Sequence, residues 1–154
     1  MNWWKATTVS HVDISSLGIE LDDSPERVQL DALWLFLSKE VTWGRWRTRE
    51  IVELQVASAW RVVGAYQLGT QDMVGFARAI SDGLCVAYLD DVYVVARLRR
   101  RGIGLAIVDF MINNGAGANF RWMLHTDDAH AFYARAGFKP PDQKYLERPS
   151  PLMR

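Results

Sequence analysis

Val92-Tyr93-Val94-Val95-Ala96-Arg97-Leu98-Arg99-Arg100-Arg101-Gly102-Ile103-Gly104 joins a strand-like run to the start of a helix. β-branched and aromatic residues at its beginning are typical of a strand. From Ile103 onward, apolar residues recur at i, i+4, i+7 and i+8, which predicts a helix over residues 103–113. Backbone N–H groups in the first turn of a helix have no intrahelical partners. A strand that enters a helix through a glycine-containing turn is therefore typical of a phosphate-binding site.

Positive charge and glycine both gather in this turn. Four arginines stand between residues 97 and 101, and glycine at 102 and 104 allows a ligand to approach the backbone closely. The turn lacks the Lys-Ser/Thr ending of a P-loop and the third glycine of a dinucleotide fingerprint. The alternative is a surface turn whose arginines are solvated.

The composition is that of one domain covering residues 1–154. Nearly half of the 154 residues (49%) are apolar, enough for a packed core, and a segment up to about residue 11 is expected to be loose. Cys85 is the single cysteine, which favours a reducing, cytoplasmic setting. No apolar run approaches the ~20 residues of a membrane span, and the start lacks the regions of a signal peptide. We therefore expect neither membrane insertion nor secretion.

Charge is balanced overall and polarised along the chain. Lys+Arg and Asp+Glu number 18 each, but residues 1–95 hold 8 basic and 13 acidic side chains, whereas residues 96–154 hold 10 and 5. A net charge of zero argues against a nucleic-acid partner, which needs a basic face. The split itself is either chance or a sign that the two halves meet ligands of opposite charge.

The rest of the chain predicts a mixed α/β domain. Strands are expected over residues 19–21, 60–66, 73–80, 84–95 and 122–126, and further helices over residues 25–39, 48–57 and 129–136. The three consecutive strands between residues 60 and 95 form an antiparallel meander. The strand–helix–strand order that follows predicts parallel pairing on the other side of the sheet.

Two segments of this chain resemble the GNAT superfamily of N-acetyltransferases. Arg99-Arg100-Arg101-Gly102-Ile103-Gly104 matches the family's R/Q-x-x-G-x-G/A signature, and residues 128–138 are similar to its A-x-x-F/L-Y-x-x-x-G-F segment. The resemblance to small bacterial members extends over roughly residues 19–149. Val95-Ala96 departs from the His-Pro pair often found after the family's fourth strand.

The resemblance implies the GNAT fold, with a parallel splay between strands 4 and 5, and acetyl-CoA as co-substrate without a metal. Val92 and Val94 would bind the pantetheine arm by strand addition, and Tyr133 would be the general acid that protonates the leaving thiolate. The other cofactor-binding residues would be Arg99, Arg100, Arg101, Gly102, Ile103, Gly104 and Phe132. Tyr133 could instead simply pack on the core.

The acceptor site is less defined. Asp90 and Asp91 are candidate bases on the fourth strand, and because neighbouring strand residues point to opposite faces, only one is expected to serve. Glu40, His125 and a water chain are rivals, and Trp43 and Trp46 lie in a linker that borders the acceptor site in the family. The three histidines do not form a metal spacing.

The favoured function is direct acetyl transfer to a primary amine of a small molecule or peptide, by a monomer or homodimer. The alternative is a noncatalytic acyl-CoA-binding sensor or interaction module. A toxin that acetylates aminoacyl-tRNA would need a basic face for RNA, which the zero net charge disfavours.

Overall fold

The computed structural model describes residues 13–150, so the segment expected to be loose up to residue 11 lies outside the described residues. Its strands are β1 (Ile19–Asp22), β2 (Arg61–Gln67), β3 (Met73–Ser81), β4 (Val86–Val94) and β5 (Arg121–Met123). Its α-helices are α1 (Leu30–Lys39), α2 (Arg49–Ala57), α3 (Ile103–Asn113) and α4 (His130–Arg135). Short 3₁₀ turns precede β1, α1, α3 and β5.

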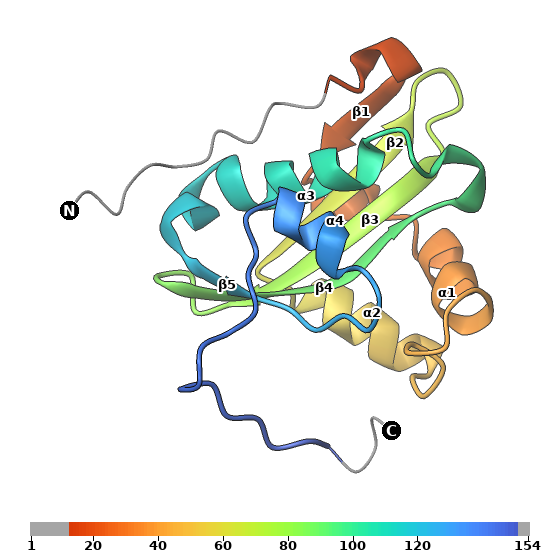
Figure 1. Cartoon of the computed structure of the whole chain (residues 1–154). Helices are drawn as coiled ribbons and strands as arrows, with labels where there is room; N and C mark the ends of the chain where they lie inside the picture. Colours follow the sequence, from red (N-terminus) through yellow and green to blue (C-terminus); the bar gives the residue numbers. More distant parts are fainter. Residues whose placement is uncertain (1–12, 151–154) are drawn as a thin grey trace.

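The sheet has the strand order β1-β2-β3-β4-β5 (Figure 1). The first four strands pair antiparallel, and β4 pairs parallel with β5. This confirms the predicted mixed α/β sheet. The meander is one strand longer than the three-strand run expected, because β1 pairs with β2 through registers such as Ile19 with Gln67.

Helices cover both faces of the sheet (Figure 1). The side chains of α3 form one core with β2 and β3, and α4 packs against the same core. The side chains of α1 and α2 form a second core on the opposite face, around the fully buried Phe76. Each sheet face therefore buries its apolar residues under a helical layer. Among residues 13–150, no helix combines the length and apolarity needed to cross a membrane.

Most element boundaries follow the sequence pattern. Helix α3 spans the predicted residues 103–113, and α2 begins at Arg49 after Thr48, whose hydroxyl accepts from the Ile51 N–H at 3.4 Å. The helix predicted from residue 25 is divided, because Val28 has extended backbone, so Pro25 opens only a 3₁₀ turn and α1 begins at Leu30. Strand β5 was predicted to reach residue 126 but ends at Met123, because its pairing with β4 stops there.

Candidate active site

A β-bulge interrupts β4 where it pairs with β3. Phe76 pairs with Tyr93 and Arg78 with Asp90, so Ala77 of β3 faces two residues of β4. The bulge residue Asp91 has φ +52°, a left-handed conformation that is uncommon outside glycine. Strand β4 pairs with β5 only over residues 86–88, which leaves residues 89–94 without β5 partners. The predicted splay between strands 4 and 5 is confirmed.

The splayed edge leads to the first turn of α3. Gly102, the N-cap residue, has φ +88°, and no side chain of residues 13–150 caps this end of the helix. The first intrahelical bond runs from the Ala106 N–H to the Gly102 carbonyl at 3.0 Å. The N–H groups of α3 that precede Ala106 therefore have no intrahelical partner and point out of the helix end. Together with the helix dipole, such N–H groups can stabilise an anion.

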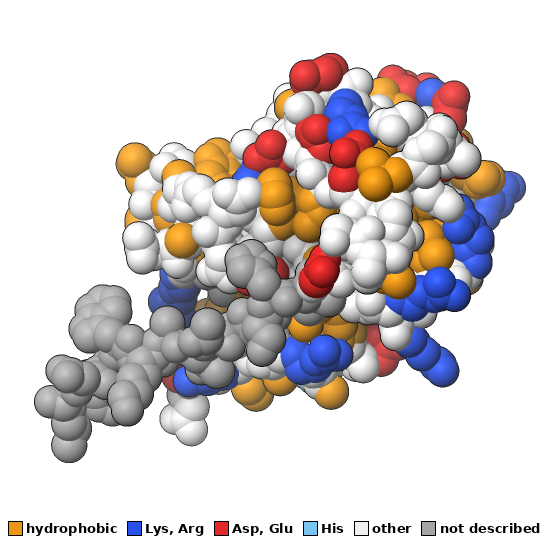
Figure 2. All heavy atoms as spheres, turned by 90° about the horizontal axis from the view of Figure 1, so that it is seen from above, with side chains coloured by type: hydrophobic (Ala, Val, Ile, Leu, Met, Phe, Trp, Pro, Cys, Tyr) orange, Lys and Arg blue, Asp and Glu red, His pale blue; other side chains and the backbone are white. Residues whose placement is uncertain are grey.

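Arginines immediately precede this helix end in the sequence. Basic side chains gather along the right-hand edge of Figure 2, the edge at which Figure 1 shows the turn between β4 and α3. Arg99 folds back, its Nε donating to the Val94 carbonyl at 2.8 Å and its Nη2 lying 3.8 Å from Glu40 Oε2. Arg100 and Arg101 are exposed. Glu40, at the end of α1, therefore lies beside the turn over residues 97–101, which we call the arginine turn.

Gly104 has a packing role that the sequence did not indicate. A Cβ atom at this position would lie 3.3 Å from the Phe132 ring of α4 and 3.6 Å from Val94 of β4. Phe132 is half-buried against the core that α3 forms with the sheet. The missing side chain thus lets α4 approach the β4–α3 junction, in addition to any access that it gives a ligand.

Replacing Gly104 by Val should displace Phe132 and lower the free energy of unfolding by about 1–3 kcal/mol, the usual cost of overpacking. Gly104→Ala is the matched variant, because it adds only the Cβ and gains roughly 0.5–1 kcal/mol of helix propensity. Urea unfolding of the two variants checks this expectation. If Gly104→Val were as stable as the wild type, the packing role of Gly104 would be contradicted.

The two neighbouring aspartates form a buried ion network with two arginines. Arg47 donates to both Asp91 oxygens at 3.0 and 2.8 Å, and Arg78 Nε donates to Asp91 Oδ2 at 2.8 Å. Arg78 Nη2 also donates to Asp90 Oδ2 at 2.6 Å. The side chains of Asp91, Arg47 and Arg78 are only 2–3% exposed. Both oxygens of Asp91 are thus occupied by guanidinium groups.

This arrangement corrects the expected alternation of Asp90 and Asp91. Both carboxylates contact Arg78, so they lie on the same side of β4 rather than on opposite faces, because the bulge at Asp91 interrupts the strand's regular alternation. Asp90 is the more accessible of the two, with its side chain 35% exposed. Burial and the charge of Asp91 raise the pKa of Asp90, and Arg78 opposes them.

Arg47 connects the linker between α1 and α2 to the bulge residue Asp91. Its guanidinium carbon lies 5.7 Å from the Trp43 ring centre and 5.9 Å from that of Trp46, and its Nη1 donates to Gln55 of α2 at 2.9 Å. Trp43 and Trp46 remain nearly half exposed. The linker is therefore fixed beside the splay with two aromatic rings at the surface. Sequence reasoning missed both Arg47 and Arg78, although the charge of Arg78 within an apolar strand was a signal that could have found it.

Tyr133 lies on α4 between two aromatic rings. Its ring makes edge contacts with Phe132 and Phe138, with centres 4.9 and 5.7 Å apart. Burial, followed by the charges of Asp90 and Tyr88, raises the pKa of Tyr133 to about 12. The hydroxyl is thus protonated at neutral pH, and Asp90, Tyr88 and Tyr133 share one region of the site.

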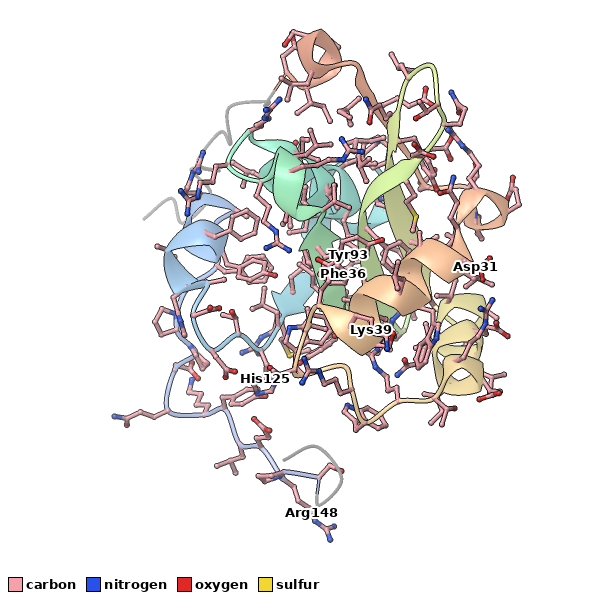
Figure 3. The ribbon with its side chains drawn as sticks, turned by 90° about the vertical axis from the view of Figure 1, so that its right-hand side faces the viewer. Asp31, Phe36, Lys39, Tyr93, His125 and Arg148 are labelled. Atoms are coloured by element: carbon pink, nitrogen blue, oxygen red, sulfur yellow. The ribbon has the colours of Figure 1, made fainter. Side chains whose placement is uncertain are left out.

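His125, just beyond β5, is hydrogen-bonded through both ring nitrogens. Its Nδ1 lies 2.8 Å from Tyr88 Oη, and its Nε2 lies 2.5 Å from Glu147 Oε2. Figure 3 shows His125 below the Phe36–Tyr93 pair, whose rings stack with centres 3.8 Å apart. Sequence reasoning had selected His125 but neither Tyr88 nor Glu147. Within residues 13–150, no three His, Cys, Asp or Glu side chains are grouped so that they could hold a metal ion.

The mixed sheet, the β4 bulge and the splay define an acyltransferase-type α/β fold. Residues 55–140 match the acetyltransferase (GNAT) domain. A solved protein from Xanthomonas campestris pv. campestris, assigned to the GNAT family of acetyltransferases, is 30% identical with a TM-score of 0.79, over 88% of this chain and 95% of that one. The chain belongs to the GNAT acetyltransferase family.

Other solved structures share this fold. A Deinococcus radiodurans R1 protein described as an acetyltransferase is 26% identical with a TM-score of 0.68, over 85% of this chain and 89% of that one. Glucosamine-6-phosphate N-acetyltransferase from Arabidopsis thaliana is 12% identical with a TM-score of 0.60, over 84% and 97% of the two chains, and shows the fold alone. No curated protein matches the chain.

Proposed function

We propose that this protein is an acetyl-CoA-dependent N-acetyltransferase that transfers the acetyl group directly to a primary amine. The splayed edge of β4, which leads straight to the uncapped first turn of α3, carries the proposal. A free strand edge can bond to the amides of a pantetheine arm, and the helix end with its arginines suits a pyrophosphate. Family members use acetyl-CoA, and these residues fit that co-substrate.

The co-substrate would be held by two parts of the site. Val92 and Val94 would supply backbone bonds along the splayed edge, and Arg99 would have to release the Val94 carbonyl that it occupies at 2.8 Å. Residues 100–104 would bind the pyrophosphate, with Phe132 packed behind them against Gly104. Holding both substrates in one site makes the attack effectively unimolecular, a large part of the rate gain.

The acceptor would enter beside the α1–α2 linker. Trp43 offers a partly exposed ring there, and Glu40 and Asp90 would supply negative charge. Such a surface suits a cationic amine that carries apolar groups. Tyr133 would donate its proton to the CoA thiolate as the C–S bond breaks.

The test is a turnover screen of acetyl-CoA with a panel of amines: a polyamine, an amino sugar, an amino acid, a peptide amine and an arylalkylamine. Thiol release that depends on the added amine supports the proposed activity. Acetyl-CoA binding in calorimetry without thiol release from any amine would instead identify a noncatalytic sensor. Failure to bind acetyl-CoA would contradict both functions.

Acetyl-CoA binding should weaken as salt is raised, because salt screens the attraction between exposed arginines and phosphates. We expect a Kd in the micromolar range and a smaller salt dependence for the Arg100→Gln/Arg101→Gln variant. Arg121→Gln, which removes an exposed charge at the start of β5, is the matched control and should retain the wild-type slope. Equal slopes for all three proteins in calorimetric titrations would rule out the arginine turn as the pyrophosphate site.

A further inference from the structure

Tyr88, His125 and Glu147 form a hydrogen-bonded chain at the point where the sheet opens. Tyr88 pairs with Met123 in the last register of the β4–β5 ladder, so its side chain stands at the edge of the splay. His125 follows β5 by two residues, and Glu147 comes from the C-terminal segment. Residues 37 and 22 positions apart in the sequence thus make two consecutive short contacts, of 2.8 and 2.5 Å respectively.

The donors and acceptors of this chain have a defined order. An ionised Glu147 carboxylate only accepts, so the Nε2 of a neutral His125 must carry the hydrogen, and Nδ1 then accepts from the Tyr88 hydroxyl. Polarisation of a hydroxyl by an imidazole that a carboxylate orients is a general arrangement for proton transfer. The inner end is half-buried at Tyr88, whereas His125 and Glu147 are 54% and 44% exposed. The hydrogen-bonded chain of Tyr88, His125 and Glu147 therefore runs from the splay to solvent.

We propose that Tyr88, His125 and Glu147 are the proton-accepting relay of the acetyl transfer, an inference that rests on the proposed N-acetyltransferase function. One proton of the bound ammonium passes to Tyr88 Oη while the Tyr88 proton passes to His125 Nδ1. The free amine that this leaves bonds to the thioester carbon, and its nitrogen releases a second proton to water. The C–S bond breaks with its electron pair on sulfur, which takes a proton from Tyr133. His125 is left as an imidazolium stabilised by Glu147 and returns its extra proton to water, and Tyr133 regains a proton from water.

The groups around Tyr88 support a relay rather than a lone base. Burial, then the charge of Asp90, raises the pKa of Tyr88 to about 12, and Tyr145 and Glu147 of the C-terminal segment act in the same direction. Tyr88 thus stays protonated near neutral pH and can only pass a proton on. Tyr133 is the titratable group that faces this region from α4.

Asp90 is less suited to accept the amine proton. Its Oδ2 already accepts from Arg78 at 2.6 Å, and its Oδ1 accepts from the Asp91 N–H at 2.9 Å. A carboxylate that holds a buried guanidinium loses that ion pair when it is protonated. Asp90 therefore supplies negative charge beside the relay and attracts the cationic amine.

The experiment compares Tyr88→Phe, His125→Gln and Glu147→Gln with the wild type. The matched control is His130→Gln, which changes an exposed histidine at the start of α4. Acetyl-CoA and the panel amine with the fastest thiol release are used from about pH 5.5 to 9.5. We expect kcat to fall about 10²-fold in Tyr88→Phe and His125→Gln, the lower range for a lost acid or base, and about tenfold in Glu147→Gln. The losses should shrink at high pH, where the free amine needs no deprotonation, with acetyl-CoA affinity unchanged.

A purely structural role of these hydrogen bonds would give a different result. If the variants raise KM but keep the wild-type kcat and pH profile, Glu147 only fastens the C-terminal segment, and the relay is overturned. If the wild type releases no thiol with any amine, the proposed function fails and the relay fails with it. Should Tyr88→Phe not fold, the two surface variants decide. In NMR spectra at one fixed pH, Glu147→Gln must also shift the His125 ring signals, and unchanged signals overturn the relay independently of turnover.

Discussion

Asp91→Asn should lower the free energy of unfolding by about 3–5 kcal/mol, the usual cost of removing one partner from a buried ion pair. The substitution leaves Arg47 and Arg78 buried without the carboxylate that accepts three of their hydrogen bonds. Asparagine tolerates a positive φ such as the +52° of Asp91, so the change removes charge without forbidding the bulge. Urea unfolding followed by circular dichroism measures the loss.

The matched control is Asp23→Asn, which breaks a 2.8 Å pair with Arg61 at a half-exposed site. Exposed pairs contribute about 0–1 kcal/mol, so the free energy of unfolding of this variant should be close to that of the wild type.

Arg47→Met should be strongly destabilising and should also change tryptophan fluorescence, because it frees the linker that carries Trp43 and Trp46. The costs of Arg47→Met and Asp91→Asn should combine to less than their sum. A loss below about 1 kcal/mol for Asp91→Asn would contradict this account of the network.

Local sequence patterns predicted those parts of the fold that depend on local structure. The apolar spacing from Ile103 predicted the bounds of α3, and the β-rich runs predicted the strands of the meander. The split of the first helix at Val28 was not predicted, because proline at a helix start fits a 3₁₀ turn equally well. Boundaries that tertiary contacts decide, such as the end of β5, were also missed.

The candidate site shows the same limit. The motifs selected the β4–α3 turn and Tyr133 as candidates. The partners of Asp91 and His125 come from distant segments: Arg47 is 44 residues from Asp91, and Tyr88 is 37 residues from His125. No periodic pattern encodes such pairs. The rule that strand neighbours alternate failed at Asp90 and Asp91, because a bulge adds a residue that periodicity alone does not show.

Tyr133→Phe should lower kcat by about 10²-fold to 10⁴-fold, the usual range for the loss of a general acid, with little change in acetyl-CoA affinity. The phenol is removed while the ring contacts with Phe132 and Phe138 are kept. Tyr66→Phe is the matched control, because it removes a buried hydroxyl from β2 and should leave kcat unchanged. Thiol release with the best amine of the panel measures both variants.

The dependence on the leaving group separates an acid from a packing residue. A donor whose thiol is more acidic than CoA needs less protonation as it departs, so the loss caused by Tyr133→Phe should shrink with such a donor. Because the pKa of Tyr133 is raised to about 12, the wild-type acid remains protonated across the assay range and should contribute no alkaline limb below about pH 10. Any pH dependence near neutrality then reports proton removal from the amine. Equal turnover of wild type and Tyr133→Phe with acetyl-CoA would exclude Tyr133 from the reaction, whereas an equal loss with every donor would assign it to packing.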